Sequence, residues 1–357
     1  MHYGSISLLP IYDLILFFSA ISRPLKIRGR RAFFDLMASS YLLISAIIGG
    51  FFIWQSNLDF VSTVENSYLY LYLILIPLYA RSRIFYEIDS EKLFLYGVLI
   101  TALVAIIQIF INGGHSIVVG DIYGWPNSTF FSSAILMYGV FSEKHKMKFK
   151  ILLIILAGFL MVLDQQRGAF LNVTILLILY LFLNSKGKFF KNMIKALVLI
   201  IPLFLIVLLI DERSSGGFFL SIIYPDEYIA EFSSGADRIA QIIIYINALS
   251  DWEHLLFGYG PSYAIIPTGW NDLHMGYISF IARYGLPAFL VTFFLLYDVI
   301  KYSIINIKTS FLSVIFLSIL SDALTQTTFD SVPTSAIFIL VILILKSKIY
   351  RGGIINV

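Results

Sequence analysis

The sequence has no cysteine among its 357 residues. A chain without thiols cannot form disulfides, thiolate-bound zinc sites or iron–sulfur clusters, and it cannot use a cysteine nucleophile. The zinc pattern His-Glu-x-x-His, the calcium loop, the Gly-x-Ser-x-Gly elbow and the glycine loops that bind phosphate or dinucleotides are also missing. We therefore expect no metal and no cofactor, so that any chemistry uses oxygen and nitrogen groups.

Charge is scarce as well. Only 13% of the residues are charged, about half the share of an average soluble protein, whereas 59% are hydrophobic and 16% are aromatic. This composition excludes a soluble globule. The net charge of +3 is too small to indicate nucleic-acid binding. The composition therefore predicts an all-α polytopic membrane protein in contact with the lipid bilayer.

Apolar runs that are long enough, or nearly so, to cross a hydrocarbon layer of roughly 30 Å recur along the chain. The first run lacks the basic start and small-residue cleavage site of a signal peptide, so we expect a retained helix. We predict about 11 transmembrane helices (11–12) in a single integral membrane domain, residues 1–357, without internal repeats. The predicted spans are 5–22, 32–54, 66–80, 93–112, 128–141, 150–164, 168–184, 194–210, 275–299, 309–325 and 334–346.

The distribution of basic residues predicts the topology. Alternate loops hold 21 of the 25 lysines and arginines, and such loops are typically cytoplasmic. These loops are 23–31, 81–92, 144–150, 186–195, 301–308 and 346–351. The N-terminus would then lie outside and the C-terminus inside. The remaining cations, Arg167, Arg213, Arg238 and Arg283, lie on the outer side or within a span, where each needs a local reason.

One outer loop is much longer than the others and covers about 60 residues, 211–274 with its approach to the next span. It is rich in aromatic and apolar residues, so we predict an ordered lid with short helices over an active site. Asp237 is a suitable N-cap for a helix from Arg238 to Leu249. Arg238, Gln241 and Tyr245 would share one helix face. Isoleucines at 239, 242, 243 and 246 would form the opposite face, buried in protein or lying along the membrane interface.

Two arginines stand at predicted helix starts, where the helix dipole disfavours a cation. Arg167 precedes the span at 168–184, and either an ion pair with Asp164 or a ligand phosphate would account for it. Arg238 has the same two explanations, with Asp237 as the neutralising partner. Because guanidinium groups bind phosphate bidentately, two of them from different elements could hold a pyrophosphate.

The other candidates are more ambiguous from residue type alone. His274 stands where the long loop re-enters the membrane, and Asp272 could orient its imidazole for proton transfer, although an isolated interfacial histidine is commonly structural. For Arg283 we favour snorkelling or a structural ion pair, and for Arg213 a solvated surface charge. Residues 258–261, Gly-Tyr-Gly-Pro, predict a tight turn with a geometric role.

The order of these features resembles the O-antigen polymerase (Wzy) and O-antigen ligase superfamily over roughly residues 150–290. The resemblance rests on Arg167-Gly168 at an outer helix start, Asp237-Arg238 in the long late loop, and residues 256–260, Leu-Phe-Gly-Tyr-Gly. It continues with His274-Met-Gly-Tyr277 and Tyr284-Gly285. Members of that superfamily commonly have about a dozen spans with both ends inside, whereas the present pattern predicts eleven.

The resemblance implies a GT-C-like glycosyltransferase in the bacterial inner membrane that acts at the periplasmic face without a nucleotide sugar. As a polymerase, it would transfer the growing glycan from undecaprenyl pyrophosphate to an incoming lipid-linked repeat unit. A chain-length regulator and a flippase are implied as partners. Arg167 and Arg238 would hold the pyrophosphate, and His274 would position the acceptor hydroxyl, take its proton or contact the leaving phosphate. The predicted substrate-binding residues are Gln166, Gln241, Tyr245, Asp272 and Tyr277.

Three alternatives remain at the level of sequence. An O-antigen ligase would use the same pyrophosphate site but transfer finished glycan to lipid A-core; the short chain and modest loop favour the polymerase. A transporter for the lipid-linked glycan would typically show paired repeats or broken helices in both halves, which the sequence pattern does not show. A membrane scaffold would predict that substitutions of all three candidate catalytic residues are silent.

Overall fold

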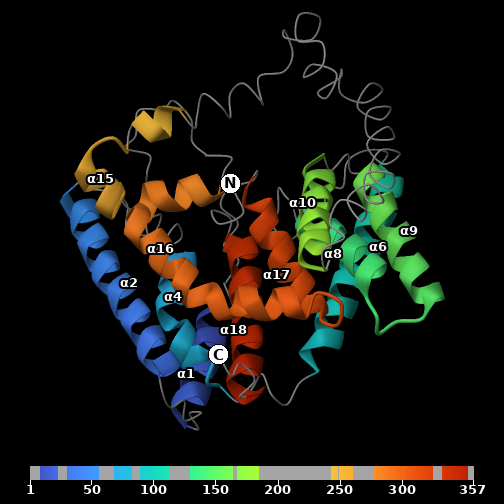
Figure 1. The fold of residues 1–357 in the computed structure, drawn as a ribbon, viewed down its shortest axis with the longest axis horizontal. Coiled ribbons are helices and arrows are strands. Elements are labelled where there is room, and N and C mark those ends of the chain that lie inside the picture. The colour runs from blue at the N-terminus through green and yellow to red at the C-terminus, as the bar shows by residue number, and fades with distance from the viewer. Residues whose placement is uncertain are drawn as a thin grey trace, which may run out of the picture.

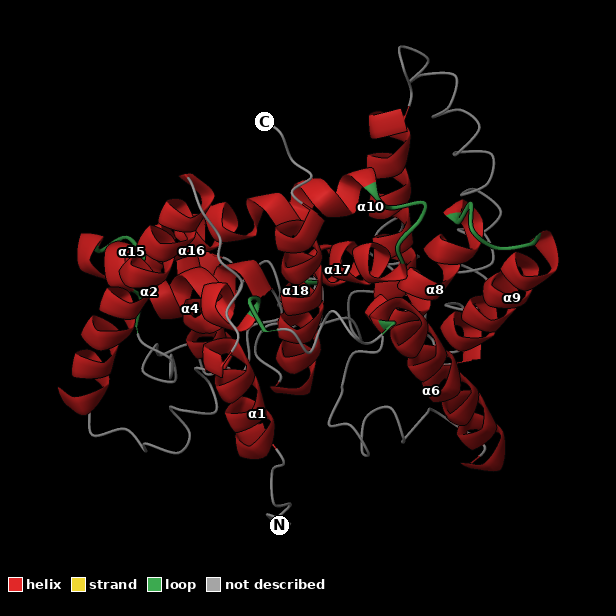
Figure 2. Cartoon of the chain, turned by 90° about the horizontal axis from the view of Figure 1, so that it is seen from below, coloured by secondary structure: helices red, strands yellow, loops and turns green. Residues whose placement is uncertain are grey.

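The computed structural model describes residues 9–22, 30–55, 68–82, 89–112, 129–163, 167–184, 243–247, 249–259, 276–324 and 332–352. Within these ranges the regular structure is entirely α-helical (Figure 2). Ten of the eleven predicted spans coincide with a helix, and the eighth, 194–210, lies outside the described residues.

Among the described residues up to 184, the helices are α1 (Leu9–Ser22), α2 (Arg30–Gln55), α4 (Tyr68–Tyr79), α6 (Ser90–Asn112), α8 (Thr129–Phe141), α9 (Met147–Leu163) and α10 (Arg167–Asn184). After them come α15 (Trp252–Phe257), α16 (Gly276–Ile305), α17 (Phe311–Asp322) and α18 (Val332–Gly352). Of these, α15 belongs to the long predicted loop and is too short to cross a membrane.

The described helices have the character of a membrane protein. Among the described residues, two helices are long and apolar enough to cross a bilayer, Ser90–Ile107 and Gly276–Ile305, and five more are shorter apolar helices. Large apolar side chains also lie on the outward faces, as at Phe294, which is 78% exposed, and Ile111, which is 74% exposed. Lipid tails would cover such surfaces at little cost. The number of crossings stays a prediction.

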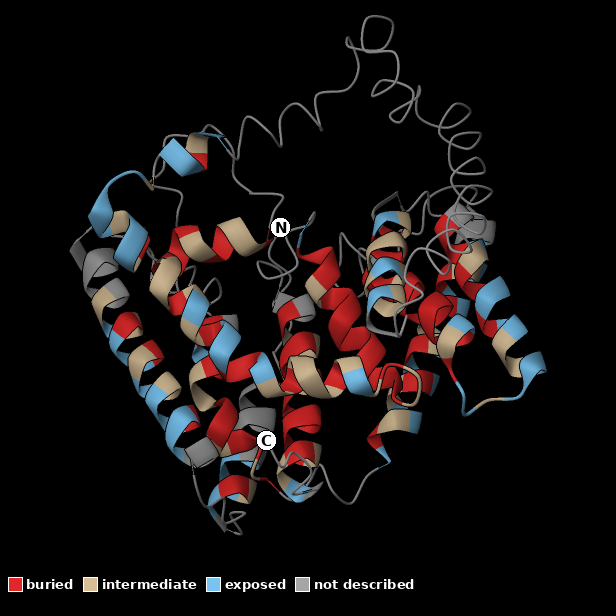
Figure 3. Ribbon diagram, viewed as in Figure 1, coloured by how far each residue is buried: buried red, intermediate tan, exposed pale blue. Residues whose placement is uncertain are grey.

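The described helices form two groups that are joined by α17 and α18. Figure 1 shows α1, α2 and α4 beside α16 in one group, and α6, α8, α9 and α10 in the other, with α17 and α18 between them. The buried residues concentrate along α17, α18 and α8, where the two groups meet (Figure 3). The core therefore runs through the middle of the bundle.

The helix α16 is broken, whereas the sequence pattern predicted one continuous span over 275–299. Gly285 has φ 82° and ψ 161°, which are not helical angles, and Pro287 follows two residues later. The break folds the two arms together, because the rings of Tyr277 and Phe289 lie with centroids 5.9 Å apart. In a straight helix these residues would be about 18 Å apart. The second arm, 286–305, is long enough for roughly 30 Å, and the first arm, 276–284, is a separate short helix.

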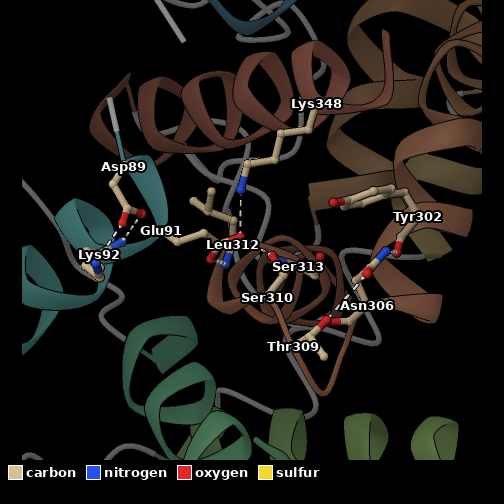
Figure 4. Close-up of polar contacts among 10 residues, drawn as sticks. All are labelled: Asp89, Glu91, Lys92, Tyr302, Asn306, Thr309, Ser310, Leu312, Ser313 and Lys348. Carbon is tan, nitrogen blue, oxygen red and sulfur yellow. Dashed lines mark hydrogen bonds and ion pairs between the residues drawn. The ribbon is translucent and has the colours of Figure 1, made fainter. Parts of the chain in front are cut away.

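Four of the predicted inner loops meet at one end of the bundle. Glu91, at the start of α6, pairs with Lys348 of α18 at 2.8 Å and accepts hydrogen bonds from the Ser310 hydroxyl at 2.5 Å and the Leu312 amide at 3.2 Å (Figure 4). Lys308 pairs with Glu143 at 3.0 Å. These four loops therefore share an end, as the alternation of basic loops predicts. The compartment that this end faces remains a prediction.

Lys346 corrects the predicted end of the last span. The charge pattern assigned it to an inner loop, but α18 continues to Gly352, and the Lys346 side chain is fully buried. Its ammonium contacts an Asp35 carboxylate oxygen of α2 at 2.8 Å and the Leu295 carbonyl of α16 at 2.7 Å. The Tyr350 hydroxyl donates to the other Asp35 oxygen. This charge tolerates burial because a carboxylate neutralises it and a carbonyl accepts from it.

Candidate functional site

Two helix starts meet at the last turn of α17. The Asn172 amide, on the second turn of α10, donates to the Asp322 carboxylate at 2.8 Å, and both side chains are fully buried. The Tyr277 hydroxyl, on the first turn of α16, donates to the Leu320 carbonyl at 2.5 Å. Because Leu320 and Asp322 are two residues apart, the beginnings of α10 and α16 converge on a single turn.

This convergence lies away from the end that holds the predicted inner loops. The other end of α17 is fixed there by the contacts of Glu91 with Ser310 and Leu312, and α17 is about 18 Å long. The sequence predicted that α10 and α16 begin on the outer side. The contacts at Leu320 and Asp322 agree with both helices starting at one common end.

Arg167 is the first residue of α10, as the sequence predicts. Free backbone N–H groups and the positive end of the dipole make a helix start favourable for an anion, and a cation there attracts one further. The Arg167 side chain and residues 164–166, which include Asp164 and Gln166, lie outside the described part of the chain. Both explanations of Arg167 therefore stay open.

The long loop docks onto the first arm of α16. Its residues 243–247 are helical, within the range predicted from Arg238 to Leu249. Tyr245 is 1% exposed and packs with Ala282, against which Ile278 and Tyr259 also pack. The Tyr259 amide donates to the Ala282 carbonyl at 2.7 Å. The loop is thus attached by a side-chain contact and by a backbone hydrogen bond.

The two faces predicted for this loop helix differ in exposure. The face with Tyr245 is covered by protein, and the face with Ile243 and Ile246 is exposed. The sequence predicted that the isoleucines are either buried in protein or lie along the membrane interface. Ile243 is 53% exposed and Ile246 is 60% exposed, so these two are not buried in protein. Tyr245 is the buried member of the helix. Substrate binding by Tyr245 stays a prediction, and in this structure its ring packs on α16.

Two glycines allow α15 and α16 to approach at backbone distance. Gly258, the C-cap of α15, has φ 71° and ψ −174°, and Gly285 has φ 82° and ψ 161°. A Cβ on Gly258 would lie 2.6 Å from the Tyr284 nitrogen, and one on Gly285 would lie 2.5 Å from the Leu256 carbonyl carbon. Gly258 therefore has the geometric role predicted for residues 258–261, of which 260 and 261 lie outside the described residues.

Aromatic side chains surround this contact. The rings of His254 and Tyr259 stack with centroids 3.8 Å apart and an interplanar angle of 10°. Burial raises the pKa of the Tyr259 hydroxyl, and the negative charge of Asp251 raises it further, so Tyr259 is neutral near pH 7. The ring of Tyr284 stacks on that of Tyr70 in α4 with centroids 4.0 Å apart, which anchors the first arm of α16 to the bundle.

Arg283 is 5% exposed and lies two residues before the break at Gly285, so it is buried in protein and does not snorkel into water. This corrects one of the two roles that the sequence left open for it, and a structural ion pair remains. Its backbone faces Gly258, where a Cβ on the glycine would overlap it. Arg283 is thus part of the surface that receives α15.

Tyr277 lines an apolar pocket between the two arms of α16. Rings at Phe289 and Phe293 and the side chains of Leu73 and Phe338 contribute to its walls. Because the Tyr277 hydroxyl is bonded to Leu320, the residue here orients the helix start. Its predicted contact with substrate stays a prediction.

The remaining predicted site residues lie outside the described residues. These are Arg238, Gln241, Asp272 and His274. In sequence, Arg238 stands five residues before Ile243, and His274 stands two before Gly276. Among the residues that are described, no group of three or more histidine, aspartate or glutamate side chains could hold a metal ion.

Sequence reasoning missed the buried polar partners. Asn172, Asp322 and Asp35 lie inside apolar runs where the pattern indicates membrane-spanning helices, and a polar residue in such a run is itself a signal of a buried contact. The sequence carries that signal for each residue, but it does not pair residues 150 or more positions apart, as Asn172 and Asp322 are.

A comparison with known families matches part of the chain. A family model described as O-antigen ligase matches residues 152–293, which begin within α9 and end within the second arm of α16. This match supports a place in the O-antigen polymerase and ligase superfamily and does not separate polymerase from ligase. Members act as glycosyltransferase-like enzymes on lipid-linked glycans in the membrane. No curated protein matches the chain.

Proposed function

We propose that the protein is a polysaccharide repeat-unit polymerase of the O-antigen type, working at the periplasmic face of the bacterial inner membrane. The donor is a glycan on undecaprenyl pyrophosphate, and the acceptor is a single lipid-linked repeat unit. The observation that carries the proposal is the convergence of α10 and α16 on the last turn of α17. Both helix starts lie within residues 152–293, which the O-antigen ligase model matches, and α17 follows that region. The helix that Arg167 begins and the helix that His274 precedes meet at this turn of α17.

The proposed reaction is a displacement at the anomeric carbon of the donor glycan. The acceptor hydroxyl oxygen forms a bond to this carbon while the bond to the phosphate oxygen breaks, and undecaprenyl pyrophosphate leaves with the electron pair. Negative charge develops on the leaving phosphate, so Arg167 and Arg238 would lower the barrier by holding it. The hydroxyl proton goes to His274 if this residue is the general base.

The flanking polar residues complete the proposed site. Gln166 and Gln241 would bind beside the two arginines, and Asp272 would orient the His274 imidazole. Of the residues that were predicted to bind substrate, Tyr245 and Tyr277 are the two that the structure describes. The lid role of residues 211–274, the chain-length regulator and the flippase belong to the same proposal.

The matched family gives a second candidate, because its model is described as O-antigen ligase. A ligase would use the same pyrophosphate contacts but transfer the glycan to lipid A-core. The two reactions differ in the acceptor, so the products in a deletion strain separate them.

The deciding experiment deletes the gene in its host and restores it with the wild type or with His274→Ala. Surface lipopolysaccharide is then separated by size on a gel. Loss of the ladder with one repeat unit still on the core supports the polymerase. Loss of every repeat unit, with glycan accumulating on the lipid carrier, supports the ligase, and an unchanged ladder rejects both.

The arginine roles are tested in the same strain. Arg167→Ala and Arg238→Ala should each abolish transfer while the protein still accumulates in the membrane. Arg238→Lys should also impair transfer, because a lysine keeps the charge but not the bidentate fork. Arg351→Ala is a matched control, since Arg351 is exposed in the last turn of α18. Full activity of either alanine variant would remove that residue from the phosphate site.

A further inference from the structure

We propose that Gly258 and Gly285 are positioning residues that join the long loop to the first arm of α16 in a single register. This pair is called the glycine junction below. The inference rests on the proposed function, because the junction would set how the segment after Arg238 stands relative to the helix after His274. Neither glycine contacts substrate in this role.

The junction is reciprocal. Gly258 ends α15 and faces the backbone of Arg283 and Tyr284, and Gly285 breaks α16 and faces the backbone of Leu256. Each glycine therefore lies directly against the backbone of the other helix, where a side chain would not fit. Sliding α15 by one residue along α16 would bring a Cβ into one of these contacts.

The backbone angles fit no other residue. Both glycines have φ between +60° and +180° and ψ near ±180°, a region that is essentially restricted to glycine. Glycines that merely lie inside a helix do not have this requirement. Gly158 in α9 has helical surroundings with no atom within 4 Å of a Cβ placed on it.

The segments that make contacts around the glycine junction begin a few residues after two of the predicted catalytic residues in the sequence. Tyr245 is buried against Ala282, and the Tyr259 amide donates to the Ala282 carbonyl at 2.7 Å. The docked loop residues thus begin at Ile243, five residues after Arg238, and the receiving arm begins at Gly276, two after His274. A shift of about 1 Å between groups that act together can reduce a rate by about 100-fold.

The first test measures the junction without reference to activity. The chain has no cysteine, so Leu256→Cys with Leu286→Cys introduces one unique pair beside Gly285. A short bismaleimide should cross-link this pair in isolated membranes. Introducing Gly258→Ala or Gly285→Ala into that background should reduce the cross-linked fraction at least about five-fold, because the added methyl group forces the backbones apart. Gly158→Ala in the same background should leave the yield unchanged.

The second test measures transfer. In the deletion strain, Gly258→Ala and Gly285→Ala should lose the lipopolysaccharide ladder at wild-type membrane abundance, while Gly158→Ala keeps it. In membranes that carry the cysteine pair and Gly258→Ala, the cross-linked protein should recover transfer of radiolabelled lipid-linked repeat units. Restored transfer identifies a positioning role, since a cross-link does not repair a general loss of folding.

The outcomes separate the junction from the proposed function. Reduced cross-linking with a normal ladder would overturn the positioning role, and so would an unchanged cross-link in both glycine variants. If deletion of the gene leaves the ladder unchanged, the proposed polymerase function is refuted. A strong cross-link in the wild-type protein would still support the glycine junction in that case. If the alanine variants do not accumulate, Ala282→Leu displaces Tyr245 without backbone strain, and it must lower both the cross-link and the ladder.

Discussion

The buried pair of Lys346 and Asp35 gives the sharpest stability prediction. We consider Asp35→Asn, which keeps the size of the side chain and removes its charge, together with Lys346→Met and the double variant. The side chain of Lys346 is 0% exposed and that of Asp35 is 8% exposed, with 2.8 Å between the ammonium nitrogen and the carboxylate oxygen. Each single change leaves the opposite charge buried without its counter-ion.

The size of the effect follows from that burial. Removing one partner of a buried ion pair typically costs about 3–5 kcal/mol, because the remaining charge keeps its desolvation cost. The double variant buries no charge at this place, so it should be destabilised by at least about 2 kcal/mol less than the sum of the singles. The partly exposed ion pair of Glu91 and Lys348 is a useful comparison. Their side chains are 22% and 28% exposed, so water screens each charge when its partner is removed.

Reversible unfolding in mixed micelles of sodium dodecyl sulfate and a mild detergent, followed by tryptophan fluorescence, measures these free energies. The reasoning would be refuted by single variants that cost less than about 1 kcal/mol, or by a double variant that costs the full sum. Either result would mean that water or a rearranged helix end stabilises the remaining charge.

Three further predictions concern other contacts. Gly139→Ala should destabilise the protein in the same unfolding assay, whereas Gly97→Ala should not, because a Cβ on Gly139 lies 3.1 Å from α9 side chains and one on Gly97 meets no atom within 4 Å. Glu91→Gln should lower the thermal denaturation midpoint in detergent and increase amide exchange at the start of α17, since it weakens the bond to Lys348 and the contacts with that helix start. Burial lowers the pKa of His145 below its usual 6.5. As the pH falls through about 6.5, the unfolded chain therefore binds more protons at this residue than the folded protein does. The wild type should lose stability in that range relative to His145→Gln. Equal pH profiles for these two proteins would contradict the burial of His145.

The sequence predicted helices well wherever an apolar run was bounded by charge. The starts of α6 and α10 were placed within three residues, because Glu91 and Arg167 stand where water or an ionic partner is needed. The same reasoning misplaced the end of the last span. Lys346 looks like the first cation of an inner loop, and only the presence of Asp35 on α2 makes its burial affordable.

The break of α16 could not be derived from periodicity alone. Gly285 and Pro287 are each compatible with several helix geometries, so neither residue predicts a sharp bend by itself. The bend also depends on α15, which fills the space beside Gly285. For the candidate site, the predicted starts of α10 and α16 converge on α17, and the roles of the site residues stay a prediction. The sequence pattern did not identify the pairing of Asn172 with Asp322, because a polar residue in an apolar run indicates a buried contact but not the distant residue that makes it.

The order in which the chain is synthesised gives α18 a particular importance. Asp35 and Glu91 are made long before their cations, which follow 311 and 257 residues later on this last helix. Until α18 enters the bundle, these two carboxylates lack the lysines that pair with them. A chain interrupted before Val332 would therefore expose both acidic groups to membrane proteases that remove unassembled helices.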